Sequence, residues 1–201
     1  YYGDKEMYGG NGTYGVSSHD IHKAVAPFII LDWDDTVGVT LPADAGLPLS
    51  DFFASGQAIA RTSWSDDAAV VHFKSDEIWG GWSHADDNTF GFLAYGDGIL
   101  ADPGAHYYYA RHHNAVLIGG IGQGYKTPGH DTAGEITRFE DKGDHVIMTG
   151  DATEAYAKFV TGEPHLDVKK VLRHLCFIRE PEPMLLILDE IEMNDGRPHD
   201  Y

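Results

Sequence analysis

Short apolar runs separated by turn residues recur about every 8 to 12 positions from Leu49 to the end of the chain, a spacing typical of all-β domains. Within the runs, some positions alternate, as Phe90, Phe92 and Ala94 do with Thr89, Gly91 and Leu93. This period of two predicts strands that bury one face. The predicted strands are 57–64, 68–74, 89–95, 99–101, 115–118, 135–140, 145–149, 171–178 and 184–191.

Turn residues between these runs predict hairpin connections. Asp97-Gly98, Lys142-Gly143-Asp144 and Glu180-Pro181-Glu182-Pro183 are the clearest of them. Between the strands, the segment 152–159 is the one expected to form a helical turn. The fold class is therefore all-β, and we expect a large antiparallel, multi-sheet β-sandwich.

The first part of the chain has a different pattern. Residues 1–16 are rich in Gly and Tyr and predict a loop, and Ile21–Ala26 predicts a short helix that Pro27 ends. Residues 32–48 carry acids, Gly and Pro and are typical of a linker. We therefore expect two parts: 1–48, the end of a helical region and a linker, and 49–201, the β-sandwich.

The composition of the chain disfavours some classes of binding partner. The 201 residues carry 14 Lys and Arg against 32 Asp and Glu, a formal net charge of −18, which disfavours nucleic acid and anionic membranes. No apolar run reaches the roughly 20 residues that a membrane helix needs. The single cysteine excludes an internal disulfide and a cysteine-based zinc cluster. We interpret the strong acidity as that of an exported protein, secreted or periplasmic.

Histidine is abundant, with 12 residues, and two of them stand near carboxylates at predicted strand ends. His84, Asp102 and His113 offer two imidazoles and a carboxylate, a reasonable set for a divalent metal and most simply for Zn²⁺. The alternative is structural: both histidines bond to backbone, and Asp102 caps the Pro-Gly turn that follows it. Spacing alone does not decide between these interpretations, because no short motif links the three residues.

Other candidates leave similar choices open. Tyr107 belongs to a run of three tyrosines that either stacks on sugar rings or covers a sheet face. Arg61 either forms a buried ion pair or faces a ligand. Lys169, Lys170 and Arg173 form a basic cluster, which we interpret as a solvated strand edge rather than an anion site.

Several segments, in their order along the chain, resemble the heparinase II/III-like polysaccharide lyases, a group that includes alginate and glycosaminoglycan lyases. Each segment is weak evidence alone, and the ordered set covers most of residues 55–191. The segments are Arg61-Thr62-Ser63-Trp64, Ser83-His84-Ala85-Asp86-Asp87-Asn88-Thr89-Phe90, Gly96-Asp97-Gly98-Ile99-Leu100-Ala101-Asp102-Pro103-Gly104, His113-Asn114-Ala115-Val116, Gly150-Asp151-Ala152-Thr153-Glu154-Ala155-Tyr156 and Arg173-His174-Leu175-Cys176-Phe177.

The resemblance implies an N-terminal (α/α) toroid, mostly missing from this chain, followed by the β-domain seen here. It also implies a bound metal, usually zinc, held by His84, Asp102 and His113. The implied activity is cleavage of a uronic-acid-containing glycan of the alginate, glycosaminoglycan or ulvan type by β-elimination. A base removes the C5 proton, polar groups neutralise the carboxylate, and an acid protonates the leaving oxygen. In such enzymes the toroid supplies the catalytic Tyr and His, so we expect the catalytic residues before Tyr1.

One position departs from the family pattern. The family commonly has His-x-His-x-Asp, whereas this chain has Trp82 in the place of the first histidine. Tryptophan can stack on a sugar ring but cannot donate a charge-assisted hydrogen bond to a carboxylate, so His112 is a candidate replacement. Trp82, Arg61, His112 and Tyr107 are the substrate-binding candidates for an acidic polysaccharide or oligosaccharide. The alternative function is a non-catalytic carbohydrate-binding or structural β-domain, and a homo-oligomer is compatible with either.

Overall fold

Alternating burial along the strands builds two antiparallel sheets in the computed structural model, which describes residues 40–76, 84–102, 109–124, 134–157 and 166–200. The chain divides into two compact units, 1–45 and 46–201. The predicted helix Ile21–Ala26 lies outside the described residues. Among the residues that the structure describes, no helix has both the length and the apolar character that crossing a membrane requires.

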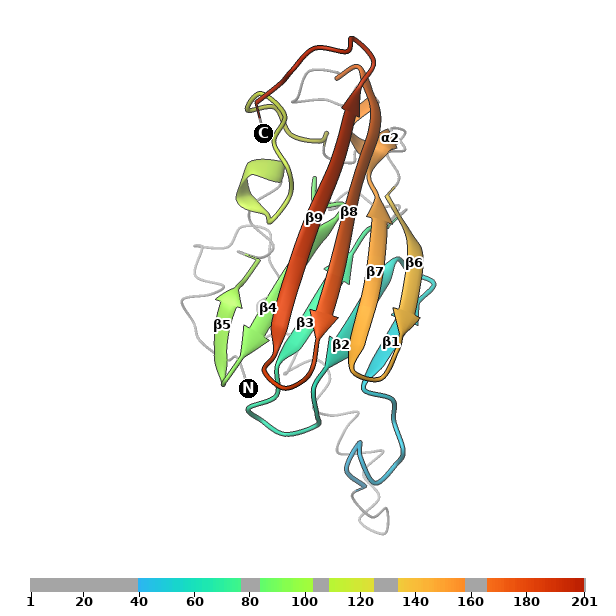
Figure 1. The fold of residues 1–201 in the computed structure, drawn as a ribbon, viewed down its shortest axis with the longest axis vertical. Coiled ribbons are helices and arrows are strands. Elements are labelled where there is room, and N and C mark those ends of the chain that lie inside the picture. The colour runs from blue at the N-terminus through green and yellow to red at the C-terminus, as the bar shows by residue number, and fades with distance from the viewer. Residues whose placement is uncertain (1–39, 77–83, 103–108, 125–133, 158–165, 201) are drawn as a thin grey trace, which may run out of the picture. The chain divides into compact units, whose positions relative to one another are not determined.

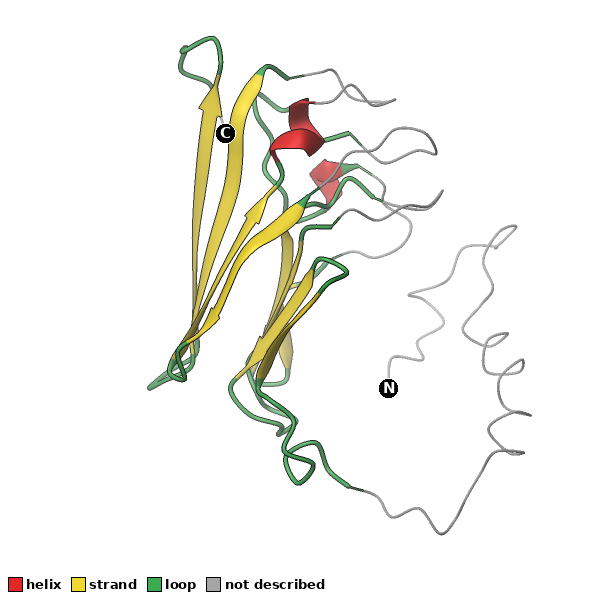
Figure 2. Cartoon of the chain, turned by 90° about the vertical axis from the view of Figure 1, so that its right-hand side faces the viewer, coloured by secondary structure: helices red, strands yellow, loops and turns green. Residues whose placement is uncertain are grey.

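The second unit is a β-sandwich of a five-stranded sheet, in the order β1-β2-β3-β4-β5, and a four-stranded sheet, in the order β6-β7-β8-β9 (Figure 1). Seen from the side, the two sheets form two layers (Figure 2). This arrangement confirms the predicted all-β sandwich. The strands are β1 (Ser50–Phe53), β2 (Gln57–Arg61), β3 (Val70–Lys74), β4 (Thr89–Ala94), β5 (Asp97–Leu100), β6 (Glu135–Asp141), β7 (His145–Asp151), β8 (Val168–Ile178) and β9 (Met184–Met193). The described residues also form a 3₁₀ turn, η1 (Ala110–His112), and a short helix, α2 (Thr153–Ala157).

The core lies between the sheets because each central strand turns alternate residues inward. On β3 the buried side chains are Val71 and Phe73, and on β8 they include Leu175 and Phe177. Small residues on β2, such as Ala58, accommodate these large side chains. A second apolar cluster, built around Ile118, Tyr156 and Val171, packs beneath α2. The helical turn expected within 152–159 is thus present and is buried on one side.

Because neighbouring strands are antiparallel, successive connections lie at opposite ends of the sandwich. At one end, which we call the loop end, the strands are connected by residues 54–56, 75–88, 101–134 and 152–167. At the opposite end, which we call the turn end, the strands are connected by residues 62–69, 95–96, 142–144 and 179–183. The predicted hairpins at 142–144 and 180–183 are confirmed.

One strand was not among those predicted, and one predicted strand was wrong. Ser50–Phe53, which the sequence did not single out, pairs antiparallel with β2 as the edge strand β1. It is too short to show an alternating pattern. Residues 115–118 were predicted to be a strand, but they contribute a single bridge between Ile118 and Ile121.

The turn between β4 and β5 lies two residues earlier than predicted. Tyr95 and Gly96 have φ angles of +57° and +79°, which is the conformation that a two-residue hairpin turn needs. Asp97 and Gly98, the predicted turn, are the first residues of β5. Gly96 is suited to this position because it adopts positive φ without a steric penalty.

An arginine fixes the turn end. Arg179, with a side chain only 6% exposed, donates two hydrogen bonds to the carboxylate of Asp141, at 2.8 and 3.0 Å. It also donates to the carbonyl oxygens of Gly143 and Arg61, and Ser50 donates a short hydrogen bond to Asp141. These contacts join β1 and β2 of one sheet to the β6–β7 turn of the other.

Candidate metal centre

The loop end brings together two histidines that are far apart in the sequence. His84 lies in the connection between β3 and β4, and His113 follows the 3₁₀ turn η1 directly. Their ring centroids are 5.3 Å apart with an interplanar angle of 33°. The side chain of His113 has no exposed surface, whereas His84 is half-buried. The two imidazoles therefore face a common space at the edge of the fold.

Asp86 completes a group with the spacing of metal ligands. His84, Asp86 and His113 each offer one nitrogen or oxygen atom, and these atoms all lie within 4.8 Å of one another. The ligand atoms of a tetrahedral zinc lie about 3.3 Å apart, given metal–ligand distances of about 2.0 Å. Two imidazole nitrogens and one carboxylate oxygen are a donor set that suits Zn²⁺ and leaves a fourth position open. The residues present therefore fit a divalent metal.

Asp102 lies beside this group, in contact with one of its members. Its Oδ2 atom is 2.5 Å from Nδ1 of His113, and its side chain is 35% exposed. The structure thus brings all three predicted ligands, His84, Asp102 and His113, to the same end of the sandwich. It places Asp102 against His113 and adds Asp86, which the sequence analysis did not name as a ligand.

Lys74, the last residue of β3, anchors the carboxylates of this region. Its Nζ atom donates to both carboxylate oxygens of Asp86 at 2.7 Å and lies 3.5 Å from Oδ2 of Asp76. Burial lowers the pKa of Lys74, but the attraction of Asp86 and Asp76 outweighs it, so the pKa is raised and the ammonium stays charged. With Asp102, the three carboxylates and one ammonium leave a net negative charge, which favours a cation.

Two histidines in this region, His84 and His72, have lowered pKa values, which favours their neutral form. Burial lowers the pKa of His84, and the neighbouring His113 and Lys74 act in the same direction. Burial and Lys74 also lower the pKa of His72, which lies on β3 and shares a 3.2 Å hydrogen bond with Gln57. A neutral imidazole has the lone pair that metal ligation requires.

A second buried arginine positions the loops that carry these residues. Arg173 on β8 donates to the carbonyl oxygens of Asn88 and Asn114, and its guanidinium pairs with the carboxylate of Asp189 at 2.7 and 2.9 Å. Asn114 follows His113 directly, and its amide donates to the carbonyl of Phe90 at 2.8 Å. Arg173 therefore holds the segment that contains His113 against the start of β4.

The expected solvated strand edge at Lys169, Lys170 and Arg173 was therefore wrong for Arg173. β8 lies between β7 and β9, and Arg173 is only 6% exposed because it points into the sandwich. Lys169 and Lys170 form surface ion pairs with Glu192 and Glu190 of β9. The signal that could have found Arg173 is its inward position in the alternating pattern of β8.

A buried glutamine also fixes the approach to β4. Gln123 has no exposed surface; its Oε1 accepts a hydrogen bond from the backbone N–H of Asp87, and its Nε2 donates to the carbonyl of Asp87. The carboxylate of Asp87 in turn accepts from the backbone N–H of Asp76. These bonds hold the residues beside Asp86 in place, and no sequence motif predicted them.

The four substrate-binding candidates lie in different places. Trp82 and Tyr107 lie outside the described residues. His112 is exposed on η1, next to His113, with its ring 6.2 Å from that of Tyr109. Arg61 lies at the turn end of β2, where its guanidinium is 4.0 Å from the centroid of the Trp64 ring. The structure therefore places His112 beside His113 in the chain and Arg61 at the other end of the sheet.

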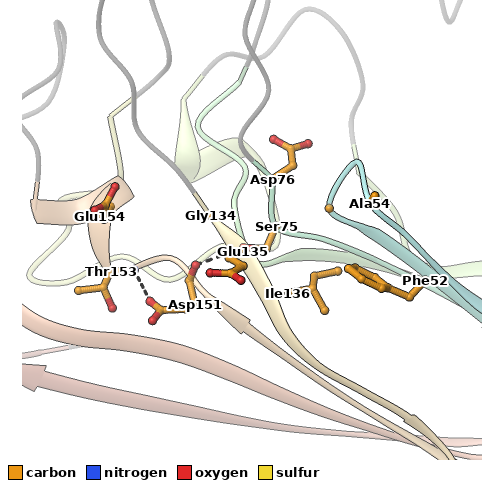
Figure 3. A pocket seen from close by; sticks show the side chains of 11 residues that line it. Phe52, Ala54, Ser75, Asp76, Gly134, Glu135, Ile136, Asp151, Thr153 and Glu154 are labelled. Atoms are coloured by element: carbon orange, nitrogen blue, oxygen red, sulfur yellow. Dashed lines mark hydrogen bonds between the residues drawn. The ribbon is translucent and has the colours of Figure 1, made fainter.

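The loop end also contains a pocket of about 680 Å³ (Figure 3). Four acidic residues line it: Asp76, Glu135, Asp151 and Glu154. The carboxylate of Asp151 accepts a hydrogen bond from the N–H of Thr153 at the start of α2. This concentration of carboxylates disfavours an anionic sugar chain inside the pocket.

No protein-family model matches the chain, and no curated protein matches it by sequence. Solved structures do match. A heparinase III matches with a TM-score of 0.60 and 17% identity, over 87% of this chain and 28% of that one. The heparan sulfate lyase HepC from Pedobacter heparinus matches with a TM-score of 0.53 and 15% identity, over 68% of this chain and 21% of that one. A further heparinase III structure matches with a TM-score of 0.51 and 17% identity, over 70% of this chain and 22% of that one. The chain thus spans about a quarter of the length of these neighbours, and at these identities the likeness shows a heparinase-like β-fold.

Proposed function

We propose that this chain is the β-domain of a polysaccharide lyase that cleaves a uronic-acid-containing glycan by β-elimination. The observation that carries the proposal is the combination of a heparinase-like sandwich with a histidine–carboxylate cluster at its loop end. The substrate class is an acidic polysaccharide, of the glycosaminoglycan, alginate or ulvan type. The catalytic base and acid belong to a helical domain outside this chain.

In this proposal the β-domain forms one wall of the substrate site. His84, His113 and a neighbouring carboxylate hold a divalent metal, most simply Zn²⁺. When bound, the metal supplies fixed positive charge beside an anionic sugar and braces the loops that carry its ligands. Lys74 and Arg173 keep the surrounding loops in position through the contacts described above. The net charge of −18 and the acidic pocket favour binding through such local groups rather than through the general field of the domain.

The test uses the full-length protein and the ultraviolet absorbance of the unsaturated uronate that β-elimination produces. Heparan sulfate, chondroitin sulfate, alginate and ulvan are the substrates, and the metal content of each preparation is measured by mass spectrometry. The test variant is the double substitution His84→Ala/His113→Ala. The matched control is Asp66→Asn, an exposed change in the β2–β3 connection at the turn end.

We expect the wild type and Asp66→Asn to bind one metal and release unsaturated product. The double histidine variant should lose the metal, with activity reduced about tenfold or more. A wild-type protein that cleaves none of the four glycans would overturn the lyase proposal.

One observation favours the alternative of a non-catalytic carbohydrate-binding or structural β-domain: Trp82 stands in the place of the histidine that faces the substrate in the family pattern. Binding of a glycan without any cleavage, measured by calorimetry on the same full-length protein, would support this alternative.

A further inference from the structure

A histidine that the proposed function does not use lies beside the metal centre. His72 is the middle residue of β3, and its two neighbours in the strand are buried in the core. Because side chains alternate along a strand, His72 and Lys74 both lie on the outer face of the five-stranded sheet, about 7 Å apart. Lys74 bonds both carboxylate oxygens of Asp86, two residues after His84 in the chain. His72 therefore stands one position along the outer face from the residue that anchors this region.

Electrostatics also place His72 near the centre, because the charges of Lys74, Asp102 and Asp86 all act on the pKa of its imidazole. Burial is the largest effect and lowers this pKa, and Lys74 lowers it further. The two carboxylates raise it by less, so the net shift is downward. The ring is therefore neutral near pH 7, with one donor and one acceptor nitrogen.

Gln57, on the neighbouring strand β2, determines which nitrogen of His72 is the acceptor. Its Oε1 atom lies 3.2 Å from Nε2 of His72. An amide oxygen can only accept a hydrogen bond, so Nε2 carries the proton and donates it to Gln57. In the neutral ring the lone pair then belongs to Nδ1. Among the described residues, Gln57 is the one hydrogen-bond partner of His72.

The sheet leaves space on one side of this imidazole. In the strand ladders His72 stands opposite Ile59 on β2 and Gly91 on β4. Apart from its chain neighbours, a Cβ added at Gly91 would have only the carbonyl oxygen of Leu100 within 4 Å among the described residues, at 3.7 Å. No side chain at position 91 therefore covers the ring, and a ligand on the outer face can approach it from the side of β4.

We propose that His72 is a substrate-binding residue whose Nδ1 atom accepts a hydrogen bond from a sugar hydroxyl, and that Gln57 is a positioning residue that acts through it. The inference rests on the proposed function in requiring that a glycan binds beside the metal centre. An esterified sugar oxygen has no hydrogen to donate to Nδ1. His72 therefore favours a glycan with a free hydroxyl at this position over the same glycan with an ester there.

The experiment uses the full-length protein and four polymers: alginate, unsulfated chondroitin, heparosan and desulfated ulvan, each also in a partly O-acetylated form. Values of kcat and KM come from the absorbance of the unsaturated product, and dissociation constants come from calorimetry. His72→Phe removes the acceptor, His72→Gln keeps an acceptor oxygen, and Gln57→Leu removes the positioning bond. The matched control is Val70→Ala, the next outward position of β3. Circular dichroism and metal analysis check that each variant is folded and loaded.

We expect His72→Phe to lower kcat/KM for the unmodified polymer about 3- to 10-fold, as for the loss of one hydrogen bond. The change should lie in KM rather than kcat, because the bond is made in the bound substrate as well as in the transition state. The preference for the unmodified over the acetylated form should fall by the same factor. His72→Gln should retain most of the preference, and Val70→Ala should match the wild type.

Gln57→Leu should raise KM in the wild-type background and leave it unchanged in the His72→Phe background, because Gln57 acts through His72. Equal effects in both backgrounds, or an unchanged preference in His72→Phe, would overturn the inference and leave the lyase proposal in place. If the wild type binds a polymer without cleaving it, the lyase proposal fails, and the same ratios of dissociation constants decide the role of His72. A wild type that binds none of the polymers would overturn both.

Discussion

Replacing Asp141 by asparagine removes the charge that pairs with the buried guanidinium of Arg179 at the turn end. In the wild type, Asp141 accepts two hydrogen bonds from Arg179 and one from Ser50. Asparagine keeps one acceptor oxygen but presents an amide group, a donor, to a guanidinium that can only donate. The remaining contacts of Arg179, to Gly143 and Arg61, are unchanged.

The expected destabilisation follows from these contacts. Two hydrogen bonds to a charged group contribute about 1.5 to 3 kcal/mol each, and the neutral bond that replaces them recovers about 1 kcal/mol. Because the Asp141 side chain is 35% exposed, water compensates part of the loss. We expect the free energy of unfolding to fall by about 3 kcal/mol, which corresponds to a melting temperature lower by about 6 to 12 °C.

The assay is equilibrium unfolding in urea, and the control is Asp144→Asn in the same turn. The side chain of Asp144 is 74% exposed, so its replacement should change stability by less than about 0.5 kcal/mol. The backbone carbonyl of Asp144, which accepts from the N–H of Arg179, is kept in that variant. A loss of less than about 1 kcal/mol for Asp141→Asn would refute this account of the turn end.

The pH dependence provides a second check of the same ion pair. Arg179 holds the pKa of Asp141 well below its usual range, despite the opposing effect of burial. A carboxyl whose pKa is lower in the folded state stabilises the fold above its unfolded pKa, about 3.9, and loses that contribution as the pH falls towards the folded value. The stability difference between wild type and Asp141→Asn should therefore be constant from pH 8 to 5 and shrink by about 1 kcal/mol by pH 3. A difference that stays unchanged at pH 3 would contradict the assignment.

Three further substitutions test the packing around the loop end, each by urea unfolding. Gly150→Ala should lower the free energy of unfolding by about 1 to 3 kcal/mol or more, because the added Cβ would lie 2.7 Å from Phe73 Cζ and closer still to Asn88 Oδ1. A variant as stable as the wild type would mean that this close approach is relaxed in solution. Phe73→Ala should cost about 3 to 5 kcal/mol, since Phe73 is fully buried between the sheets, and a cost below about 1 kcal/mol would contradict that burial. Tyr156→Phe should cost about 1 kcal/mol, because it removes the 2.6 Å hydrogen bond that the buried hydroxyl donates to the carbonyl of Val116; a stabilised variant would show that this bond contributes nothing.

Strands with a full alternating pattern were predictable from the sequence. β2, β3 and β8 lie in apolar runs that were predicted as strands, and their side chains alternate between buried and half-buried along most of each strand. β1 escaped prediction because four residues, Ser50–Phe53, are too few to show a period, and its pairing depends on β2. Segment 115–118 has the composition of a strand, but among the described residues it forms only the bridge between Ile118 and Ile121.

The candidate centre was predictable in part. The resemblance selected His84, Asp102 and His113, and the structure places all three at the loop end. The arrangement of hydrogen bonds among them could not be deduced, because it depends on side chains that come together from distant segments. Asp86 stands two residues after His84, but the pattern His-x-Asp alone does not show whether the carboxylate faces the histidine or a lysine. Here it approaches both.

The way Arg173 holds its loops has a consequence for how such a domain can diversify. The guanidinium contacts carbonyl oxygens at positions 88 and 114, and every amino acid has a carbonyl. A substitution at position 114 therefore keeps the bond from Arg173 but removes the 2.8 Å hydrogen bond that the Asn114 amide donates to the carbonyl of Phe90. The segment that carries His113 is thus fixed by one bond that any residue at position 114 can make and by a second that needs the amide of asparagine.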